Sequence, residues 1–306
     1  MSSALAAWLR NYAGFVKLSH TLFALPFALA SMLLAARDNR GWPGWRTFLL
    51  ILLAMTGART CAMAFNRIVD RKFDALNPRT SDRHLPASII SLTTAWTVCL
   101  SGGLLLVLAA WLLNPLCFYL SPVALFMVCF YSVTKRFTDY THVWLGLALA
   151  LSPLGAWLAV RGQIAWFPIR ESILIPLILA SAVVFWLIGF DIIYSLQDYE
   201  FDKKQGLKSL VVAWGPKNAL KAAFLSHLIT WGILGLFGVI CRFRIAYFVG
   251  LLIILVCFLM EHWLARRRSL NWVNIAFFRL NVLVSIVFLV ATATEVIFPW
   301  VRFKFF

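Results

Sequence analysis

Two polar stretches interrupt an otherwise apolar sequence and organise the chain: Asn66-Arg-Ile-Val-Asp70-Arg-Lys-Phe-Asp74 and Asp191-Ile-Ile-Tyr194-Ser-Leu-Gln-Asp198-Tyr-Glu-Phe-Asp202. Only 12 of the 306 residues are acidic, and more than half of them lie in or just after these stretches. Each stretch follows an apolar run of membrane-spanning length, and basic residues come next. Such clustering of a rare residue type indicates a shared chemical role.

The spacing places the polar side chains of each stretch on one face of a helix. The first stretch has steps of four residues, at Asn66, Asp70 and Asp74. The second has steps of three, four and four, at Asp191, Tyr194, Asp198 and Asp202. Stacked carboxylates repel one another unless a cation or basic partners neutralise them. Because Mg²⁺ usually binds one or two carboxylates together with substrate phosphates, two such faces across a cavity would hold a diphosphate through Mg²⁺.

Composition places the chain among polytopic membrane proteins. Hydrophobic residues make up 62% of the sequence and charged residues 13%, and the mean hydropathy is +0.85. About 20 apolar residues cross the hydrocarbon core, and backbone groups in lipid must be satisfied within helices. We therefore predict an all-α fold, with nine transmembrane helices in one bundle around a cavity open to the cytoplasmic side. The predicted spans are 15–36, 47–66, 91–113, 116–133, 142–160, 173–190, 220–240, 245–264 and 275–298.

The distribution of Lys and Arg predicts the orientation. The side that holds the N-terminus carries more basic residues than the opposite side, and such an excess marks the cytoplasmic face. We predict an integral protein of a bacterial-type inner (plasma) membrane, with the N-terminus and both acidic stretches cytoplasmic. The first span lacks a small-residue cleavage site before the next charged loop, so we expect it to be retained and not removed as a signal peptide.

Two other features exclude function classes. The six cysteines lie at or within predicted spans without CxxC spacing, which is typical of small buried apolar residues and not of disulfides or zinc ligands. The net charge of +16 follows from the basic excess on one side and favours anionic lipid. Since no soluble basic domain is present, nucleic-acid binding is not expected.

Several basic residues are candidates for binding an anionic substrate. Arg59 lies inside the second span, where a charge is costly and usually faces a cavity or another span. Arg79 and Arg83, in the loop after the first stretch, suit bidentate contact with phosphate, although a solvated basic loop has the same composition. The Lys135-Arg136 pair ends the fourth span at the membrane level of the acidic stretches; it would suit an anionic substrate or anchor the helix at the interface.

The repeated pattern also has other interpretations. The match between residues 15–140 and 141–299 suggests an internal duplication within one domain that covers residues 1–306. Many transporters are built from such repeats, so a cation-coupled transporter is an alternative class. Transporter sites lie near the bilayer midplane, whereas these carboxylates lie at helix ends, which favours an enzyme. The remaining alternative is that both stretches are solvated helix ends paired with their basic neighbours.

The two motifs resemble those of the UbiA superfamily of intramembrane prenyltransferases. Its first signature runs Asn-Asp-x-x-Asp-x-x-x-Asp, and its second runs Asp-x-x-Tyr-x-x-x-Asp-x-x-x-Asp. This chain has the second signature complete, but Arg67 replaces the second-position aspartate of the first, which removes one possible metal ligand. The surrounding sequence is similar to the 4-hydroxybenzoate polyprenyltransferase branch and to related enzymes of menaquinone synthesis, in residues 17–27, 66–86, 131–136 and 189–209.

The resemblance implies a Mg²⁺-dependent enzyme of quinone (ubiquinone or menaquinone) biosynthesis that transfers a polyprenyl group from polyprenyl diphosphate to the ring of a small aromatic acid. It implies metal binding by Asn66, Asp70, Asp74, Asp191, Asp198 and Asp202. Asp191 is our hypothesis for the base that takes the ring proton or orients the acceptor hydroxyl. Tyr194 is expected to help screen the allylic cation.

The remaining site predictions concern the two substrates. Diphosphate contacts are predicted from the basic residues in and after the motifs, namely Arg71, Arg79, Arg83, Lys135 and Lys203. Contacts with the aromatic acid are predicted from Arg59, Arg136 and His20. The predicted acceptor is 4-hydroxybenzoate, and the alternatives with the same chemistry are a dihydroxynaphthoate and a heme or chlorin.

Overall fold

The computed structural model describes residues 11–17, 21–266 and 270–298. These residues form helices and connecting loops, with no strand among them. Residues 11–15 are helical, and the α-helices from residue 21 onward are α2 (Thr21–Ala35), α3 (Trp45–Leu76), α4 (Leu92–Leu113), α5 (Pro115–Phe130), α6 (Thr141–Arg161), α7 (Leu174–Ser195), α8 (Tyr199–Lys204), α9 (Leu210–Ile240), α10 (Ile245–Arg266) and α11 (Leu270–Ile297). The predicted all-α class is confirmed.

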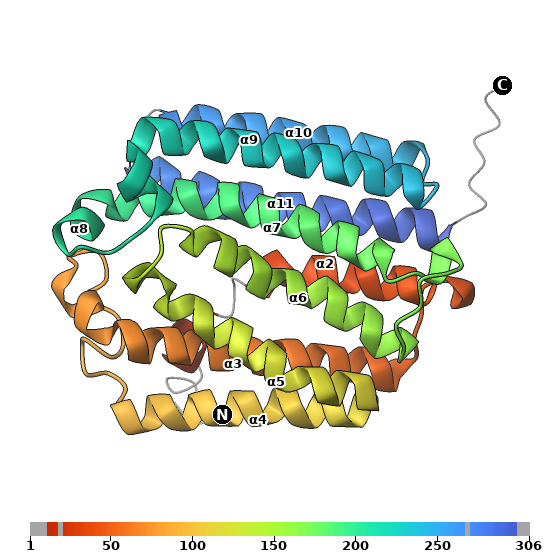
Figure 1. Cartoon of the computed structure of the whole chain (residues 1–306), viewed down its shortest axis with the longest axis horizontal. Helices are drawn as coiled ribbons and strands as arrows, with labels where there is room; N and C mark the ends of the chain where they lie inside the picture. Colours follow the sequence, from red (N-terminus) through yellow and green to blue (C-terminus); the bar gives the residue numbers. More distant parts are fainter. Residues whose placement is uncertain (1–10, 18–20, 267–269, 299–306) are drawn as a thin grey trace.

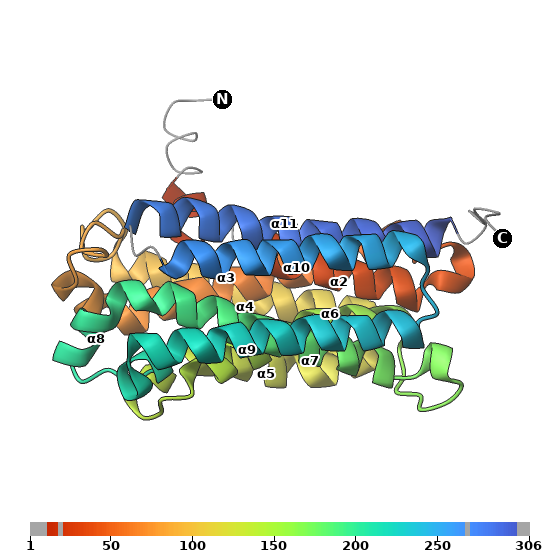
Figure 2. The same cartoon turned by 90° about the horizontal axis from the view of Figure 1, so that it is seen from above.

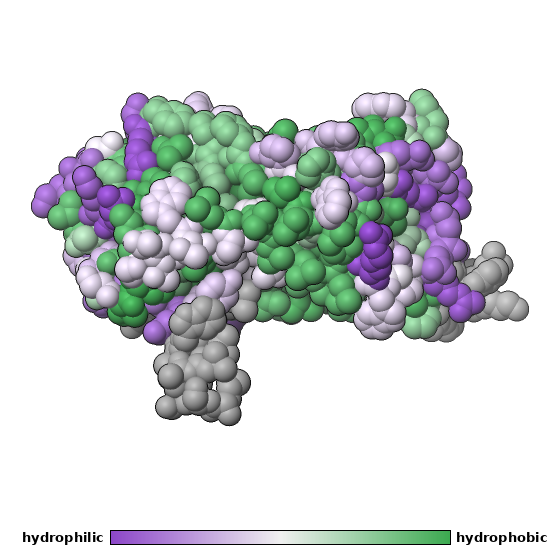
Figure 3. Space-filling model, turned by 90° about the horizontal axis from the view of Figure 1, so that it is seen from below, coloured by the Kyte–Doolittle hydropathy of each residue, from purple (hydrophilic) through white to green (hydrophobic). Residues whose placement is uncertain are grey.

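The long helices lie roughly parallel to one another in one bundle (Figures 1 and 2). Within the described residues, eight helices are long and apolar enough to cross a membrane. They match the second to ninth predicted spans. The first predicted span is represented by α2, whose 15 residues extend only about 22 Å, less than the ~30 Å hydrocarbon core. A largely apolar belt flanked by hydrophilic ends is visible on the face in Figure 3.

Aromatic packing joins the first and last helices of the bundle. Phe27 of α2 stacks on Phe288 of α11 at a ring distance of 4.9 Å and contacts Trp186 of α7 at 5.0 Å. All three side chains are fully buried. Helix α2 also packs on α6, so the chain closes on itself around α2, α6, α7 and α11.

Buried polar contacts fix the C-terminal helices relative to α7. The indole of Trp186 donates to Asn281 (2.9 Å), and Asn281 donates in turn to Glu261 (2.8 Å). Glu295 of α11 accepts a hydrogen bond from the backbone N–H of Tyr247 (3.3 Å), in the first turn of α10 where N–H groups lack helical partners. Each acidic group thus accepts a hydrogen bond in an apolar bundle, although the buried Oε2 of Glu261 has no hydrogen-bond partner among the described residues.

The two motif stretches lie at one end of the bundle, which we call the motif end (Figure 1). Helix α3 continues beyond its apolar part to Leu76 and stops before Pro78, because the preceding residue Asn77 is extended (ψ 118°). Asn66, Asp70 and Asp74 therefore lie on one continuous helix, as predicted.

The second motif is divided among three elements. Helix α7 ends at Ser195, a 3₁₀ turn η5 covers Leu196–Asp198, and α8 follows. The prediction of one continuous helical face is therefore wrong in detail. Because a 3₁₀ turn has about three residues per turn, it changes the direction of the chain while Asp198 and Asp202 still reach the same cavity as Asp191.

Candidate active site

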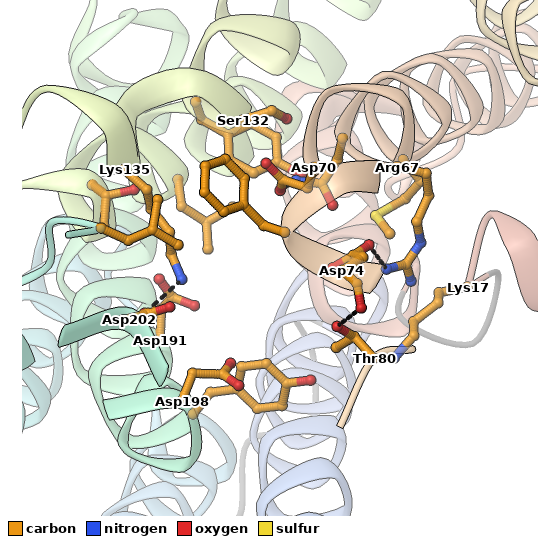
Figure 4. Close-up of a pocket in the computed structure, with 18 of the residues that line it drawn as sticks. Lys17, Arg67, Asp70, Asp74, Thr80, Ser132, Lys135, Asp191, Asp198 and Asp202 are labelled. Atoms are coloured by element: carbon orange, nitrogen blue, oxygen red, sulfur yellow. Dashed lines mark hydrogen bonds and ion pairs between the residues drawn. The ribbon is translucent and has the colours of Figure 1, made fainter. Parts of the chain in front are cut away.

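A cavity of ≈ 260 Å³ lies at the motif end of the bundle. Its walls come from α3, the loop after α3, the 3₁₀ turn η3 (Tyr131–Arg136), the start of α6, and α7 with η5 and α8. Figure 4 shows Asp70 and Asp74 on one side of the cavity, with Asp191, Asp198 and Asp202 on the other. The two predicted rows of carboxylates thus face one another.

The carboxylates of the first motif carry basic partners from other segments. Asp70 accepts a hydrogen bond from Asn66 (3.0 Å) and lies 3.4 Å from the guanidinium of Arg136. Asp74 is buried, and one of its oxygens accepts a hydrogen bond from Arg83 at 2.7 Å. The other Asp74 oxygen, Oδ2, is buried and has no hydrogen-bond partner among the described residues, and it lies 3.8 Å from the guanidinium of Arg67.

The carboxylates of the second motif are paired in the same way. Asp198 accepts hydrogen bonds from Asn77 (3.0 Å) and from two nitrogens of Arg79, one at 2.8 Å. Asp202 lies 3.3 Å from the ammonium of Lys135. Since Asn77 and Arg79 belong to the loop after α3, these contacts connect the two motifs directly.

Asp191 has a different kind of partner. Its Oδ2 lies 2.6 Å from Nδ1 of His142, the second residue of α6, whose side chain is fully buried. His142 was not predicted as a site residue, because nothing in the sequence brings residues 49 positions apart together. The only signal was a polar residue at the start of an apolar span.

Positive charge gathers on the side of the first motif. Arg67 is buried and lies 3.8 Å from Asp74, so the departure from the family signature places a cation where an aspartate was expected. Lys17, which precedes α2, lines the cavity near Thr80 (Figure 4). Burial, together with the nearby charges of Arg67 and Arg83, lowers the pKa of Lys17 to about 8.

Arg59 lies more than one helical turn from the first motif and lines the same cavity. Its Nη2 donates to the backbone carbonyl of Lys17 (3.3 Å), whereas its buried Nε has no hydrogen-bond partner among the described residues. The same cavity is also lined by apolar side chains, among them Leu145, Leu149 and Phe190. The cavity therefore offers both a buried cation and apolar surface.

The structure brings most of the predicted site residues together. The cavity is lined by all six predicted metal ligands, by Tyr194, and by Arg59, Arg79, Arg83, Lys135 and Arg136. Two predicted diphosphate residues lie elsewhere: Arg71 donates to the carbonyl of Ile68 in its own helix, and the Lys203 ammonium lies over the ring of Tyr199. Each directly follows a cavity aspartate and is turned about 100° from it on its helix. His20 lies outside the described residues.

Comparison with known proteins agrees with this geometry. The UbiA prenyltransferase family matches residues 24–283. The chain belongs to the UbiA prenyltransferase family. Membership favours the enzyme over the transporter, since the members of this family are prenyltransferases.

Two relatives of this chain are both named 4-hydroxybenzoate octaprenyltransferase. A 4-hydroxybenzoate octaprenyltransferase of Tolumonas auensis is 29% identical over 253 residues, which cover 78% of this chain and 84% of the relative. A 4-hydroxybenzoate octaprenyltransferase of Francisella tularensis is 29% identical over 263 residues, with coverage of 85% and 86%. The similarity thus extends over most of both chains.

Solved UbiA structures have the same fold. A UbiA homolog from Aeropyrum pernix, solved without ligand, superposes with a TM-score of 0.78 at 29% identity and covers 89% of this chain and 96% of that one. A UbiA homolog from Archaeoglobus fulgidus, bound to GPP and Mg²⁺, superposes with a TM-score of 0.69 at 23% identity, covering 94% and 99%.

The donor set of this UbiA cavity fits Mg²⁺ only in company with a phosphate. The candidate ligands offer oxygen, which is the donor that Mg²⁺ prefers, and Asp74 has an oxygen without a hydrogen bond. Within the described residues, however, no three His, Cys, Asp or Glu side chains are close enough to hold a metal by themselves. One or two carboxylates from each side together with substrate phosphates would complete the coordination.

Proposed function

We propose that this protein transfers a polyprenyl group from a polyprenyl diphosphate to the ring of 4-hydroxybenzoate. The observation that carries the proposal is the cavity itself, where carboxylates of two motifs face one another and basic side chains lie among them. Family membership and two relatives named for 4-hydroxybenzoate support the choice of reaction and acceptor.

The diphosphate is expected to bind between the two motifs. Asn66, Asp70 and Asp74 on one side and Asp198 and Asp202 on the other would hold Mg²⁺. When bound, Mg²⁺ neutralises the leaving diphosphate and thereby favours ionisation of the allylic C–O bond.

Basic side chains would also neutralise charge on the leaving diphosphate. Arg79, Arg83 and Lys135 are paired with carboxylates now, and their long side chains are expected to turn to phosphate oxygens once the carboxylates bind metal. Arg67 and Lys17 add positive charge on the side of the first motif.

The acceptor is expected to lie beside the diphosphate with its carboxylate on Arg59. Arg59 has an unsatisfied buried nitrogen and no carboxylate partner among the described residues, whereas Arg136 already lies beside Asp70 and over the ring of Phe73. A buried cation without a counter-ion is the more favourable partner for an anion. The electron-rich ring would then attack the allylic cation, Tyr194 would help to screen that cation, and Asp191 would take the displaced ring proton.

The orientation follows from the basic residues. We propose that the motif end faces the cytoplasm of a bacterial-type inner membrane, because the loops at this end carry the excess of Lys and Arg. A cysteine introduced at the exposed residue Asp82 of a cysteine-free variant should react with a membrane-impermeant maleimide only after the cells are opened. Labelling in intact cells would contradict the proposed orientation.

The function is tested with purified protein in lipid nanodiscs. Mg²⁺, radiolabelled polyprenyl diphosphates and a panel of acceptors are supplied, and products are separated by chromatography. The panel contains 4-hydroxybenzoate, a dihydroxynaphthoate, and heme and chlorin acceptors. Transfer to 4-hydroxybenzoate is expected, and preferential transfer to another acceptor would overturn the choice of substrate.

Two variants test the site. Asp70→Asn and Asp198→Asn are each expected to abolish Mg²⁺-dependent turnover, because each removes a charged ligand from one side of the cavity. Arg71→Ala is the matched control, since Arg71 does not line the cavity. Full activity of either aspartate variant would refute the proposed metal site.

A further inference from the structure

The contact between His142 and Asp191 differs from the other contacts of the motif carboxylates. The charged partners of Asp70, Asp74, Asp198 and Asp202 are long, flexible Arg or Lys side chains that also suit phosphate. The partner of Asp191 is a short imidazole, with Nδ1 only 2.6 Å from Oδ2. Since the His142 side chain is fully buried, it cannot turn to a bound diphosphate as the basic side chains can.

The surroundings of His142 fix its hydrogen-bonding role. Its Nε2 is buried and has no hydrogen-bond partner among the described residues. A proton on that nitrogen would be a buried donor without an acceptor, which is unfavourable. The tautomer with the proton on Nδ1 is therefore favoured, and His142 donates to Asp191.

The start of α6 is itself held in place. The hydroxyl of Thr141 lies 2.6 Å from that of Thr134, and both side chains are buried. Thr134 belongs to η3, which also presents Lys135 to Asp202. The backbone carbonyl of Lys135 accepts a hydrogen bond from Lys208 N–H (2.7 Å), in the loop after α8. His142 thus projects from a segment that is anchored on both sides.

We propose that His142 is a positioning residue for Asp191. The Nδ1–H of His142 holds Oδ2, so that Oδ1 keeps a fixed direction toward the cavity while the Arg and Lys partners exchange carboxylates for phosphate. Asp191 is thereby reserved for the aromatic acceptor. The role of Asp191 toward the acceptor rests on the proposed function. The hydrogen bond from His142 to Asp191 does not depend on it.

Three substitutions separate positioning from packing. His142→Asn keeps a donor close to the Nδ1 position, His142→Gln moves the donor toward the Nε2 position, and His142→Leu removes it. We expect kcat to fall by about 10- to 100-fold in the Gln and Leu variants, with the KM for prenyl diphosphate nearly unchanged. The Asn variant should recover most of the lost rate. Equal kcat in all three variants, or losses that appear mainly in the KM for prenyl diphosphate, would overturn the proposal.

A second measurement does not depend on the stability of His142 variants or on turnover. Protein with ¹⁵N-labelled histidine in nanodiscs should show a downfield Nδ1–H resonance for His142, as expected for a short hydrogen bond to a carboxylate. Asp191→Asn should shift this resonance, whereas Arg71→Ala should not. An unchanged spectrum in Asp191→Asn overturns the inference, while absence of prenyl transfer by the wild-type protein overturns the proposed function alone.

Discussion

The guanidinium of Arg79, in the loop after α3, donates hydrogen bonds through two nitrogens to the carboxylate of Asp198 in η5. A third nitrogen donates to the hydroxyl of Tyr194 at 3.0 Å. The loop that follows the first motif thus closes onto the second motif across the cavity. In this arrangement Arg79 occupies the carboxylate oxygens that a metal would use, so Mg²⁺ and Arg79 compete for Asp198.

This competition predicts opposite effects of Arg79→Ala on two ligands. Mg²⁺ without phosphate is expected to bind the wild-type protein only weakly, and it should bind more tightly to the variant, because Asp198 is freed. A non-reactive thiolo-diphosphate analogue of the prenyl substrate should bind more weakly, because a hydrogen bond to a charged group contributes about 1.5–3 kcal/mol, or roughly 10- to 100-fold in affinity. Isothermal titration calorimetry measures both. Weaker binding of Mg²⁺ to Arg79→Ala than to the wild-type protein would contradict the competition.

The lowered pKa of Lys17 predicts a fall of kcat/KM for prenyl diphosphate at alkaline pH. Burial and the neighbouring charges of Arg67 and Arg83 lower the pKa of Lys17 to about 8, so its ammonium is charged below this pH and becomes neutral above it. Since the charged form attracts the diphosphate, kcat/KM for prenyl diphosphate should fall as the pH rises through about 8. In Lys17→Arg, whose guanidinium stays charged, this fall in kcat/KM should occur at higher pH. If kcat/KM for prenyl diphosphate fell over the same pH range in both proteins, Lys17 would not contribute to diphosphate binding.

The helices and the acidic motifs could be predicted because their signals are local. Apolar runs of membrane length gave the second to ninth spans, and steps of four residues placed Asn66, Asp70 and Asp74 on one face of α3. The 3₁₀ turn in the second motif could not be predicted in this way, since its residues have the same apolar and polar spacing as an α-helix.

The partners of the carboxylates could not be predicted for a different reason. His142 and Asp191, like Arg79 and Asp198, meet only through the packing of the bundle. Adjacency in sequence was misleading for Arg71, because a residue directly after a cavity aspartate points to another side of the helix. Arg59 lines the cavity, which is one of the two surroundings expected for a charge inside an apolar span.

Arg59 and Arg136 predict different effects on the two substrates. Arg59→Met should raise the KM for the aromatic acid by roughly 10- to 100-fold, as expected for the loss of a buried charge-assisted contact, with little change for prenyl diphosphate. Arg136→Ala should have a smaller effect on the acid, because Arg136 is half-exposed and already beside Asp70. Steady-state kinetics with each substrate varied in turn gives the four KM values. If Arg136→Ala raised the KM for the acid more than Arg59→Met did, Arg136 and not Arg59 would bind the carboxylate of the acid.

The close contact between α3 and α4 predicts a stability difference between two glycines. A Cβ at Gly102 would lie only 2.7 Å from the backbone nitrogen of Cys61 and 2.9 Å from the carbonyl oxygen of Gly57. Small residues allow membrane helices to approach in this way. Gly102→Ala should therefore force α4 away from the helix that carries the first motif, at a cost of about 1–3 kcal/mol, as for other overpacked sites.

Gly155→Ala in α6 is the matched control, since a Cβ there meets open space. Thermal unfolding in detergent, followed by the fraction of protein that remains monodisperse, compares the two variants with the wild-type protein. Gly102→Ala should lower the midpoint by about 2–4 °C for each kcal/mol lost, whereas Gly155→Ala should leave it unchanged or raise it, because alanine stabilises a helix interior relative to glycine. Equal midpoints for the two variants would mean that the helices separate at no cost, and the first motif would then not depend on close packing of α3 against α4.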